Sequence, residues 1–398
     1  MGLIIENYFM YPKNKKIDIV VGIPSYNEAD NIEFVAKQID LGLRKYFPKL
    51  KSAIINVDND SPDNTKDEFL KAKTKTPKIY ISTPKGIRGK GNNFYNLFKA
   101  AKKLQAKTII VVDADLKSIT PEWISILGKP ILNGYDYVTP LYNRHEYDGS
   151  ITNHLCYPLM YGLLNRVIRQ PIAGDFSFSS NLMEYWINKT WYQTTKHYGV
   201  DIFMTLGAIL GKFKTCQVNL GAKIHKPSAP KLGQMFSQVV GTLFKELSAN
   251  KDGWQQKKII KETVFGKEKY QAPQNLSIDY KGIKATALYE FKINQNILKQ
   301  ALSEENYEKI HTMYSQQKLD ITGNLWSKII YDLLYAFDTT DLNSNLIEAM
   351  KSLYFGRVVS FIKQSLDLDY KESEALLQKQ AESFLKNRSY LLKKYKIS

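Results

Sequence analysis

The sequence predicts an α/β protein in which helices flank a largely parallel sheet and a helical region follows toward the C-terminus. Two observations carry this prediction. Through the first half of the chain, short runs rich in Ile and Val alternate with longer segments of mixed polarity, which is the rhythm of a doubly wound sheet. From about Met235 onward these runs give way to apolar residues spaced as on one face of a helix.

Four strands are predicted in order along the first half of the chain. They lie at 17–23, 53–57, 79–82 and 108–112, where short apolar runs are bounded by polar or turn residues. The intervening segments, 27–45, 63–73 and 92–104, have the length and mixed polarity of helices. Ligands of such sheets bind beyond the carboxyl ends of the strands. Functional side chains are therefore expected directly after each strand.

The C-terminal helices are predicted from two apolar stripes, which we interpret as core positions rather than as a cofactor site. The stripes are Trp326, Ile329, Ile330, Leu333, Leu334 and Phe337, and then Leu346, Met350, Leu353, Val358 and Phe361. Residues 251–281 are polar and are expected to form a connecting segment or a mobile loop. Together these features predict a sheet domain over 1–234 and a helical region over 235–398 that packs on it.

The composition is that of a globular chain and excludes several classes of protein. The 398 residues include 56 Lys and Arg against 39 Asp and Glu, and the resulting net charge of +17 attracts anions such as nucleotides and phosphates. Many lysines fall on polar helix faces, where solvation explains them, and no nucleic-acid-binding pattern accompanies them. Two distant cysteines exclude a zinc knuckle and a disulfide framework. No apolar run suits a membrane span or a secretion signal, so we expect a cytoplasmic protein.

Polar residues follow the first two predicted strands. The first strand ends in Ile23-Pro24-Ser25-Tyr26-Asn27-Glu28, and the second ends in Asp58-Asn59-Asp60-Ser61. Their carboxylate and amide groups suit contacts with a base or a ribose. An ordinary strand-to-helix turn, in which Asn27 caps a helix or Asx side chains bind their own backbone, explains each motif equally well. Each motif therefore supports a nucleoside site only in combination with the motifs after the other strands.

A glycine-rich segment follows the third predicted strand and favours an anion site. In Gly86-Ile87-Arg88-Gly89-Lys90-Gly91, two cations lie at the start of a predicted helix, where free backbone amides and the helix dipole add to their charge. The segment lacks the spacing of a Walker loop. A phosphate site is favoured over a flexible basic loop.

The fourth predicted strand ends in Val112-Asp113-Ala114-Asp115, which is the strongest chemical signal in the chain. Two carboxylates beside a hydrophobic strand end are costly unless a cation or several donors compensate them. Mg and Mn prefer oxygen ligands and commonly bridge carboxylates to substrate phosphates. The pair is therefore interpreted as a divalent metal site rather than as a surface turn.

Three more polar residues lie downstream. Asp175 follows Gly174 in a tight turn, Asp201 lies at the start of an apolar helix, and His225 follows Gln217-Val218-Asn219-Leu220-Gly221. Helix capping alone explains Asp201. A lone histidine is usually not a ligand, so His225 by itself is a weak candidate.

In this order the motifs resemble the retaining glycosyltransferases with a GT-A fold, most closely the group of glucosyl-3-phosphoglycerate synthases and mannosylglycerate synthases. The similarity spans most of the chain. The six closest segments are Val57 to Ser61, Gly89 to Gly91, Val112 to Asp115, Gln170 to Asp175, Tyr198 to Asp201 and Gln217 to His225. In addition, Leu353 to Val358 resembles the C-terminal helical region of the mannosylglycerate synthases. A single Asp-X-Asp motif is common by chance, whereas six ordered matches are not. The resemblance makes 1–234 a GT-A catalytic domain with a nucleotide-sugar-binding sheet.

The resemblance implies a role for each matching position. The nucleoside would be held by Pro24, Tyr26, Asn27, Glu28, Asp58 and Asn59. Lys90 would meet the diphosphate, Asp113 with Ala114 would contact the ribose or the metal, and Asp115 and His225 would ligate Mg or Mn. Gly174, Asp175 and Asp201 would surround the donor sugar, with Asp201, Asp175 and Lys90 as the catalytic groups.

The acceptor site is implied by the same resemblance. It would consist of Tyr142, Arg144, Gly149, Ser150 and Thr152, together with Ile172 and Ala173. Where the family has an arginine that grips the phosphate of phosphoglycerate, this chain has Ser150. A hydroxyl does not replace a bidentate guanidinium, so unphosphorylated glycerate is the expected acceptor. Arg144 or Lys226 could compensate, which keeps phosphoglycerate open.

The expected activity is transfer of glucose or mannose from UDP-glucose or GDP-mannose to D-glycerate, which yields a compatible solute. Alternatives are transfer to 3-phosphoglycerate, transfer to a lipid or polysaccharide acceptor, and nucleotide or polyanion binding without turnover. Retention in the family implies attack from the leaving-group face, so no protein nucleophile is required. The exposed face of the C-terminal helices is a candidate homodimer surface, although the same amphipathicity also serves folding.

Overall fold

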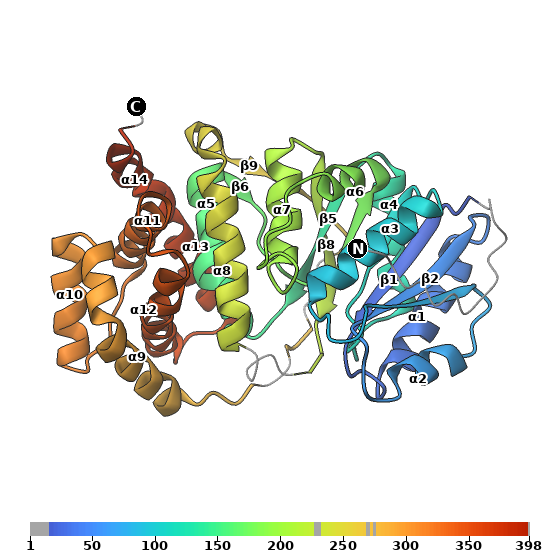
Figure 1. Ribbon diagram of the computed structural model, residues 1–398, viewed down its shortest axis with the longest axis horizontal. Coiled ribbons are helices and arrows are strands. Elements are labelled where there is room, and N and C mark those ends of the chain that lie inside the picture. Colours follow the sequence, from blue (N-terminus) through green and yellow to red (C-terminus); the bar gives the residue numbers. More distant parts are fainter. Residues whose placement is uncertain (1–15, 227–231, 268–270, 274–275, 397–398) are drawn as a thin grey trace. The chain divides into compact units, whose positions relative to one another are not determined.

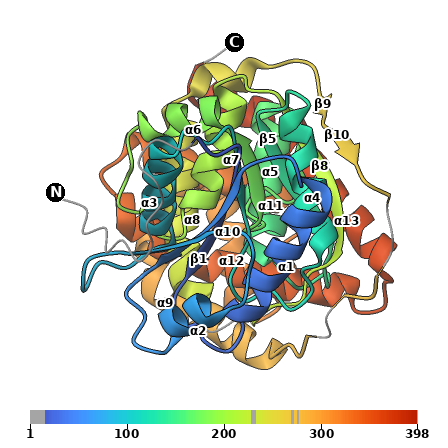
Figure 2. The ribbon, with the colours of Figure 1, turned by 90° about the vertical axis from the view of Figure 1, so that its right-hand side faces the viewer.

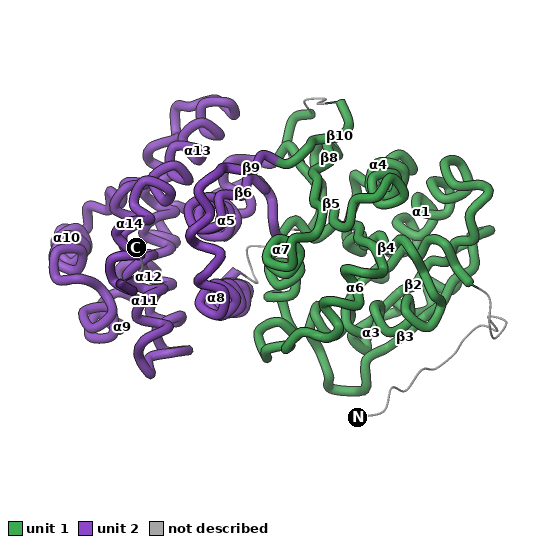
Figure 3. Tube along the Cα trace, turned by 90° about the horizontal axis from the view of Figure 1, so that it is seen from above, with its two compact units in different colours: residues 1–143, 172–229, 262–274 green, residues 144–171, 230–261, 275–398 purple. Residues whose placement is uncertain are grey.

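The computed structural model describes residues 16–226, 232–267, 271–273 and 276–396, which Figure 1 shows as a ribbon. The chain divides into two compact units, coloured separately in Figure 3. Unit 1 comprises residues 1–143, 172–229 and 262–274, and unit 2 comprises 144–171, 230–261 and 275–398. The units alternate along the sequence, whereas a single boundary at residue 234 was expected. The segment 144–171 groups with the C-terminal helices, and 262–274 groups with the sheet.

Within the described residues, unit 1 contains an eight-stranded sheet in the order β10-β8-β5-β7-β4-β1-β2-β3. The strands are β1 (Ile19–Ser25), β2 (Ser52–Asp58), β3 (Lys78–Ser82), β4 (Thr108–Val111), β5 (Tyr137–Asn143), β7 (Phe176–Ser179), β8 (Thr215–Ala222) and β10 (Thr263–Phe265). The four expected strands are β1 to β4, each within two residues of its expected limits. The prediction of an α/β sheet flanked by helices is therefore confirmed.

The strand directions decide which residues meet at each edge of the sheet. β3, β2, β1 and β4 run parallel, so their carboxyl ends lie together. β7 runs antiparallel to β4 and β5, with Phe176 opposite Val111. β7 therefore begins at the edge where β4 ends, and residues that precede β7 join residues that follow β4.

Helices cover both faces of this sheet, as Figure 2 shows with α3, α6 and α7 on one side and α1 and α4 on the other. The helices of unit 1 are α1 (Ile32–Tyr46), α2 (Thr65–Lys71), α3 (Lys90–Lys103), α4 (Pro121–Leu132), α6 (Ser180–Ile187) and α7 (Val200–Leu210). Alternate residues of a strand point to opposite faces. Ile19 and Val21 thus pack in one core with α1 and α4, while Val20 packs in the other with α3, α6 and α7. Both faces are apolar, which holds the strand ends in place.

Unit 2 is mainly helical. It contains a π-helical turn (Thr152–Cys156), α5 (Tyr157–Leu164), β6 (Arg166–Val167), α8 (Leu232–Ser248), a 3-10 turn (Lys251–Gln255), β9 (Ile260–Lys261), α9 (Tyr280–Ala301), α10 (Glu304–Ser315), α11 (Gly323–Thr339), α12 (Asn343–Ser365), α13 (Tyr370–Lys386) and α14 (Arg388–Lys394). The two predicted apolar stripes lie on α11 and α12 and are buried, except that Val358 is partly exposed and Val359 is buried beside it. The core interpretation of these stripes is confirmed.

The segment 251–281 contains more order than its polar composition predicted. Its described part includes β9, which pairs with β6, and β10, which pairs with β8 at the edge of the sheet. Strands of two or three residues are too short to produce a recognisable apolar run. Among the described helices, none has both the length and the apolar character needed to cross a membrane.

Candidate functional site

The loops after β1 and β2 are joined by hydrogen bonds and contain the residues expected to bind a nucleoside. The backbone amides of Asn27 and Glu28 donate to the hydroxyls of Ser61 and Thr65, both at 2.9 Å. Asn27 has φ +58°, in the left-handed region that asparagine tolerates better than most residues. The β1 loop is therefore shaped by the β2 loop.

Asp58 lies beneath these loops rather than at their surface. Its fully buried carboxylate accepts from the hydroxyls of Ser25, Ser61 and Tyr80 and from the backbone amide of Ser61, at 2.7 to 3.0 Å. These bonds make Asp58 a support for both loops. The buried side chain of Asn59 differs, because its Oδ1 has no hydrogen-bond partner among the described residues.

Two other expected nucleoside residues lie beside Asn27. Pro24 is buried within β1, opposite Val57 of β2. The ring of Tyr26 is faced by the guanidinium of Arg88, with 4.8 Å from Cζ to the ring centroid. The structure therefore brings the β1 loop next to the glycine-rich segment that follows β3.

The glycine-rich segment is pressed against residues 195–197. A Cβ at Gly89, whose φ is +131°, would lie 2.4 Å from the carbonyl oxygen of Lys196, and a Cβ at Gly91 would lie 2.0 Å from that of Thr195. The backbone amide of Gly91 donates to the carbonyl of His197 at 3.1 Å. Only glycine fits at these two positions, and the contact fixes the start of α3 at Lys90.

A cluster of five charged side chains occupies the edge of the sheet where β4 ends and β7 begins. In order of contact they are Asp201, Lys90, Asp113, Lys223 and Asp175. Lys90 Nζ lies 3.1 Å from Asp113 Oδ1 and 3.3 Å from Asp201 Oδ2. Lys223 Nζ lies 2.8 Å from Asp113 Oδ2 and 2.8 Å from Asp175 Oδ2. Two ammonium groups thus alternate with three carboxylates.

Burial and charge act in opposite directions on these groups. Burial favours the neutral form of Asp113, but Lys223 and Lys90 outweigh it and hold the pKa of Asp113 below its ordinary value. Burial raises the pKa of Asp175 and of Asp201, against the opposing effect of the neighbouring lysine. Despite its own burial, Lys90 has a raised pKa because of Asp113 and Asp201. Asp113 is therefore the most firmly ionised carboxylate of the three.

Asp113 and Asp175 are held in one orientation. Asp175 Oδ1 accepts from the backbone amide of Asp113 at 2.8 Å, and Asp175 Oδ2 accepts from the hydroxyl of Tyr142 at 2.6 Å. Gly174 has φ +90°, and a Cβ there would lie 2.1 Å from Asp113 Oδ2. Glycine therefore permits the close approach of the turn before β7 to the end of β4.

Asp201 is the outer member of the cluster and lies in the first turn of α7. Its Oδ2 pairs with Lys90, whereas its Oδ1 is buried and has no hydrogen-bond partner in the described part of the chain. Buried carboxylate oxygens are normally satisfied. The unsatisfied oxygen is thus available to accept a hydrogen bond from a ligand hydroxyl.

Asp115 and His225 are the pair that best fits a divalent cation. His225 Nδ1 lies 3.9 Å from Asp115 Oδ2, and both side chains are partly exposed. Nowhere in the described residues do three His, Cys, Asp or Glu side chains gather closely enough to hold a metal by themselves. Asp113, which was also expected as a ligand, directs its two oxygens to Lys90 and Lys223 instead. A cation here would need oxygen atoms from a bound diphosphate as further ligands.

The residues expected to bind the acceptor fall in both units. Tyr142, Ile172 and Ala173 belong to unit 1. Tyr142 is bonded to Asp175 as described above, and the carbonyl of Ala173 accepts from Lys223 at 2.7 Å. Tyr142 and Ala173 therefore border the charged cluster directly.

Arg144, Gly149, Ser150 and Thr152 belong to unit 2. Arg144 Nε lies 2.9 Å from Asp148 Oδ2, and Gly149 has φ +66°. The hydroxyl of Ser150 lies 2.5 Å from that of Tyr354 on α12, while Thr152 is buried at the start of the π-helical turn. Ser150 is therefore part of a neutral hydroxyl pair.

Lys223 is the member of the cluster to which the sequence assigned no role. It lies two residues before His225, inside a segment that matches the family pattern. The available signal was one of charge balance, because the four expected carboxylates, those of Asp113, Asp115, Asp175 and Asp201, outnumber the three positive charges of Lys90 and one divalent ion. Asp175 and Asp201 are buried and Asp113 is half-buried, and carboxylates removed from water need compensating positive groups.

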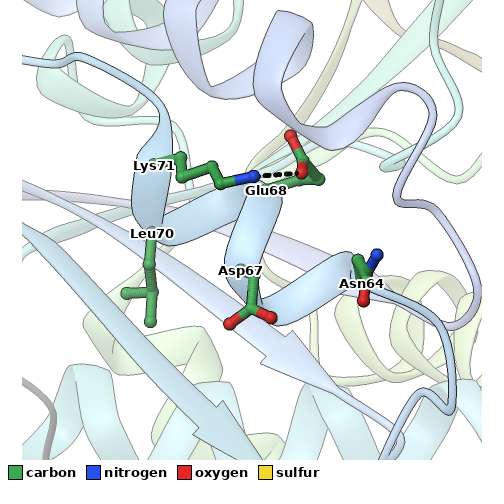
Figure 4. Close-up of a pocket in the computed structure, with 5 residues that line it drawn as sticks. All are labelled: Asn64, Asp67, Glu68, Leu70 and Lys71. Carbon is green, nitrogen blue, oxygen red and sulfur yellow. Dashed lines mark hydrogen bonds and ion pairs between the residues drawn. The ribbon is translucent and has the colours of Figure 1, made fainter.

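A separate surface pocket lies against α2. Figure 4 shows its lining residues, Asn64, Asp67, Glu68, Leu70 and Lys71, with Lys71 paired to Glu68 at 2.9 Å. None of them belongs to the charged cluster or to the residues expected from the sequence. This pocket is therefore not considered part of the functional site.

Comparison with protein families matches one continuous segment of the chain, which includes residues of both units. Residues 20–189 match the model of glycosyl transferase family 2. The match covers β1 through α6, fewer than half of the residues of the chain, and includes Lys90, Asp113, Asp115 and Asp175 but ends before Asp201 and His225. The expected glycosyltransferase domain is thereby confirmed for this segment.

Individual proteins with similarity to the chain are also known. A dolichol-phosphate mannosyltransferase of Pyrococcus furiosus is 29% identical over 180 residues, which are 42% of this chain and 47% of that protein. The chain thus spans about half the length of this relative. Two solved structures of glucosyl-3-phosphoglycerate synthase from Mycobacterium tuberculosis are similar with a TM-score of 0.48, over 58% of this chain. One, with Mn²⁺, UDP and glucosyl-3-phosphoglycerate, is 24% identical over 80% of its chain, and the other, with Mg²⁺ and UDP, is 25% identical over 79%.

Proposed function

We propose that this chain, whose residues 20–189 form a glycosyl transferase family 2 domain, is a metal-dependent retaining glycosyltransferase that transfers glucose or mannose from a nucleotide diphosphate sugar to D-glycerate. The observation that carries the proposal is the charged cluster of Asp201, Lys90, Asp113, Lys223 and Asp175, next to Asp115 and His225. The partly buried ammonium group of Lys90 and an adjacent candidate metal pair at a sheet edge suit a diphosphate leaving group.

Each part of this site has a task in sugar transfer. As the bond between sugar and diphosphate breaks, negative charge grows on the leaving oxygen, and the ammonium group of Lys90 stabilises it. Asp115 and His225 would hold the divalent ion, which supplies Lewis acid stabilisation of the same charge. Because Asp113 is paired with two lysines, we assign it to organising the site and contacting ribose rather than to ligating the metal directly.

The donor sugar is assigned to the carboxylates at the ends of the cluster. Asp201 Oδ1 is buried without a partner among the described residues, so a sugar hydroxyl that donates to it would satisfy it. Asp175, fixed by Tyr142 and Lys223, is assigned to support the adjacent turn at Gly174, which is expected to contact the same sugar. In a retaining reaction with attack from the leaving-group face, neither residue has to act as a nucleophile.

The acceptor assignment depends on Ser150. Its hydroxyl is paired with that of Tyr354, which provides no positive charge for a phosphate. This neutral pair supports glycerate over 3-phosphoglycerate as the acceptor. The name of the relative from Pyrococcus furiosus supports a second candidate, a lipid phosphate acceptor.

A donor-by-acceptor activity screen tests the proposal. UDP-glucose and GDP-mannose are each incubated with glycerate, 3-phosphoglycerate or a polyprenyl phosphate in the presence of Mg²⁺ or Mn²⁺, and products are identified by mass and anomeric configuration. An α-linked hexosylglycerate is the expected product. Turnover only with the lipid phosphate would favour the second candidate, and nucleotide binding without any product would contradict both.

Two variants test the metal assignment within the same screen. Asp115→Ala and His225→Ala are each expected to lower kcat/KM at least 100-fold while the melting temperature stays near that of the parent chain, because both side chains lie at the surface of the site. Full activity in the presence of a chelator would contradict the metal dependence.

The acceptor assignment has its own variant. Ser150→Arg introduces the guanidinium that the family uses for phosphate, so the ratio of kcat/KM for 3-phosphoglycerate to that for glycerate is expected to rise about tenfold or more. The ratio measured for Ser150→Lys separates simple charge from bidentate geometry. An unchanged ratio in both variants would show that Ser150 does not face the acceptor.

A further inference from the structure

Asn31 precedes the first residue of α1 and behaves differently from a normal helix cap. At this position an asparagine side chain usually accepts a hydrogen bond from the backbone of the first helical turn. The Asn31 side chain makes no such bond, although its backbone carbonyl accepts from Val35 as a helix start requires. The residue is 8% exposed, and its side chain points instead toward the loop after β4.

The Asn31 amide spans Asp115. Its Nδ2 donates to the carbonyl oxygen of Ala114 and to that of Leu116, each at 2.9 Å. Both hydrogens of one planar amide group are thus used on the two carbonyls that flank Asp115 in sequence. This arrangement fixes the backbone on both sides of that carboxylate.

The opposite side of the same loop is bonded to the segment that carries His225. The backbone amide of Lys117 donates to the carbonyl of Ile224 at 2.8 Å, and the amide of Ile224 donates to the hydroxyl of Ser118 at 3.0 Å. The amide of Lys226 donates to Asp115 Oδ2 at 3.3 Å. The loop therefore lies between Asn31 on one side and the His225 segment on the other.

We infer that Asn31 is a positioning residue for the cation site, because it holds Asp115 in the orientation in which the carboxylate faces His225. The inference rests on the proposed function in so far as Asp115 and His225 bind a divalent ion. Asn31 touches neither the ion nor the sugar, and it acts through the backbone of residues 114–116.

The chemistry of the contact explains why an asparagine is needed here. Two carbonyl oxygens require two N–H donors from one short side chain, which the neutral amide supplies. An aspartate of the same shape would place its oxygens against those carbonyls. Alanine would leave both carbonyls without this donor. Partners that orient metal ligands in this way commonly affect metal affinity tenfold to a hundredfold.

Equilibrium binding of Mn²⁺ to the full chain tests the inference without any measurement of activity. Binding is followed by the loss of the free Mn²⁺ signal in electron paramagnetic resonance, in the presence of UDP and, separately, of GDP. Asn31→Ala is expected to raise the Kd for Mn²⁺ about tenfold or more. If the parent chain binds no Mn²⁺ with either nucleotide, the proposed metal site and this inference both fail. If the parent chain binds and Asn31→Ala binds equally well, the inference alone fails.

Asn31→Asp separates positioning from electrostatics. Aspartate is also a good helix cap, so this variant keeps the start of α1 and is expected to fold. An additional negative charge near a cation site would by itself tighten Mn²⁺ binding, whereas loss of the two donors weakens it. Weaker binding in Asn31→Asp supports positioning, and tighter binding overturns it.

A matched control is provided by Asn64, which precedes α2 in the same way, makes no side-chain cap bond and lies in the pocket of Figure 4. Asn64→Ala is expected to leave the Kd for Mn²⁺ unchanged. In an Asp115→Ala background, Asn31→Ala should cause no further loss of Mn²⁺ affinity, because the residue through which Asn31 acts is already gone. A further tenfold loss there would overturn the assignment of Asn31 to Asp115.

Discussion

The ammonium group of Lys223 lies between the carboxylates of Asp113 and Asp175, at 2.8 Å from each. Its side chain is only 3% exposed, so the charge is compensated within the protein rather than by water. The sequence shows a lysine near the end of a strand, as it does at many surface positions. Only the antiparallel entry of β7, which brings Asp175 beside Asp113, reveals that this lysine is buried between two acids.

Substitution of Lys223 by methionine is expected to destabilise the protein by about 3 kcal/mol near neutral pH, because it leaves the buried carboxylate of Asp175 and the half-buried one of Asp113 with less compensation. Lys223 contributes to holding the pKa of Asp113 below its ordinary value. A depressed folded-state pKa adds stability above the ordinary Asp pKa of about 3.9, and that stability is lost as the pH falls toward the depressed value. The difference between parent and variant should therefore shrink in acid.

Urea unfolding at several pH values between about 3 and 7 measures this difference. Lys117→Met, at an exposed lysine beside the same loop, serves as the control and should change stability little at any pH. A Lys223→Met effect that is independent of pH would indicate lost packing rather than lost charge compensation.

Other residues of the site could be predicted from the sequence. Asp113 and Asp115 come just after the end of β4, and Lys90 lies in the glycine-rich segment between β3 and α3, so the rule that ligands bind at carboxyl ends of parallel strands selects them. Asp58 follows a strand end too, yet it is buried under four hydrogen bonds. Strand-end position indicates proximity to the site, but it does not separate a support from a ligand-binding group.

At the scale of elements, β5, β7 and β8 are strands of the sheet that hydrophobic runs in the sequence did not predict. Asp175 precedes β7 and so does not follow a strand end; the sequence indicated a tight turn at Gly174 and Asp175, and only the family resemblance implied a role for it. β5 contains Pro140, and β8 contains Gln217 and Asn219, so neither strand is the kind of run rich in Ile and Val that predicted β1 and β4. Their pairing in the sheet outweighs these local preferences.

The junction between α3 and residues 195–197 gives a prediction about an element rather than a single contact. Gly91→Ala would place a Cβ 2.0 Å from the carbonyl oxygen of Thr195, so the start of α3 must move away and take Lys90 with it. A displacement of about 1 Å at such a site lowers kcat/KM by roughly 100-fold. Steady-state kinetics with the active donor measures the loss.

Gly233→Ala is the matched control, because a Cβ added in the first turn of α8 meets nothing within 4 Å. This variant should keep the kinetics of the parent chain. Equal kinetics of Gly91→Ala and the parent chain would show that the position of α3 does not matter for turnover.

At the scale of the whole molecule, the change of residue pattern near Met235 indicated a helical C-terminal region. It did not indicate that residues 144–171 group with that region. The segment 144–171 interrupts the sheet unit and packs in unit 2, where Tyr157 and Tyr161 of α5 contact Ala381 of α13 and the indole of Trp326 donates to His154. An apolar helix such as α5 fits a core anywhere, so its sequence does not state which core it joins. That information lies in contacts between distant parts of the chain.

A truncated chain of residues 1–234 is therefore not expected to fold as an independent domain. It would expose the apolar surface of α5, and β8 would lose its neighbour β10. The truncated chain is expected to be largely insoluble, as measured by centrifugation and gel filtration after expression. Co-expression of residues 235–398 should recover part of the soluble material. A soluble, cooperatively unfolding fragment of residues 1–234 would contradict the interleaved arrangement.

Because the units are built from alternating segments, some contacts form only long after their first residue has been synthesised. Arg169 is separated by 205 residues from its ion-pair partner Glu374. The buried residues of α5 are separated by a similar length of chain from their contacts on α13. At roughly 5–20 residues per second, about 10–40 s pass between synthesis of the two ends of this contact. Throughout that interval an eight-residue apolar helix, all of it buried in the finished protein, is exposed on the nascent chain. Chaperone demand during synthesis should therefore be concentrated on residues 157–164.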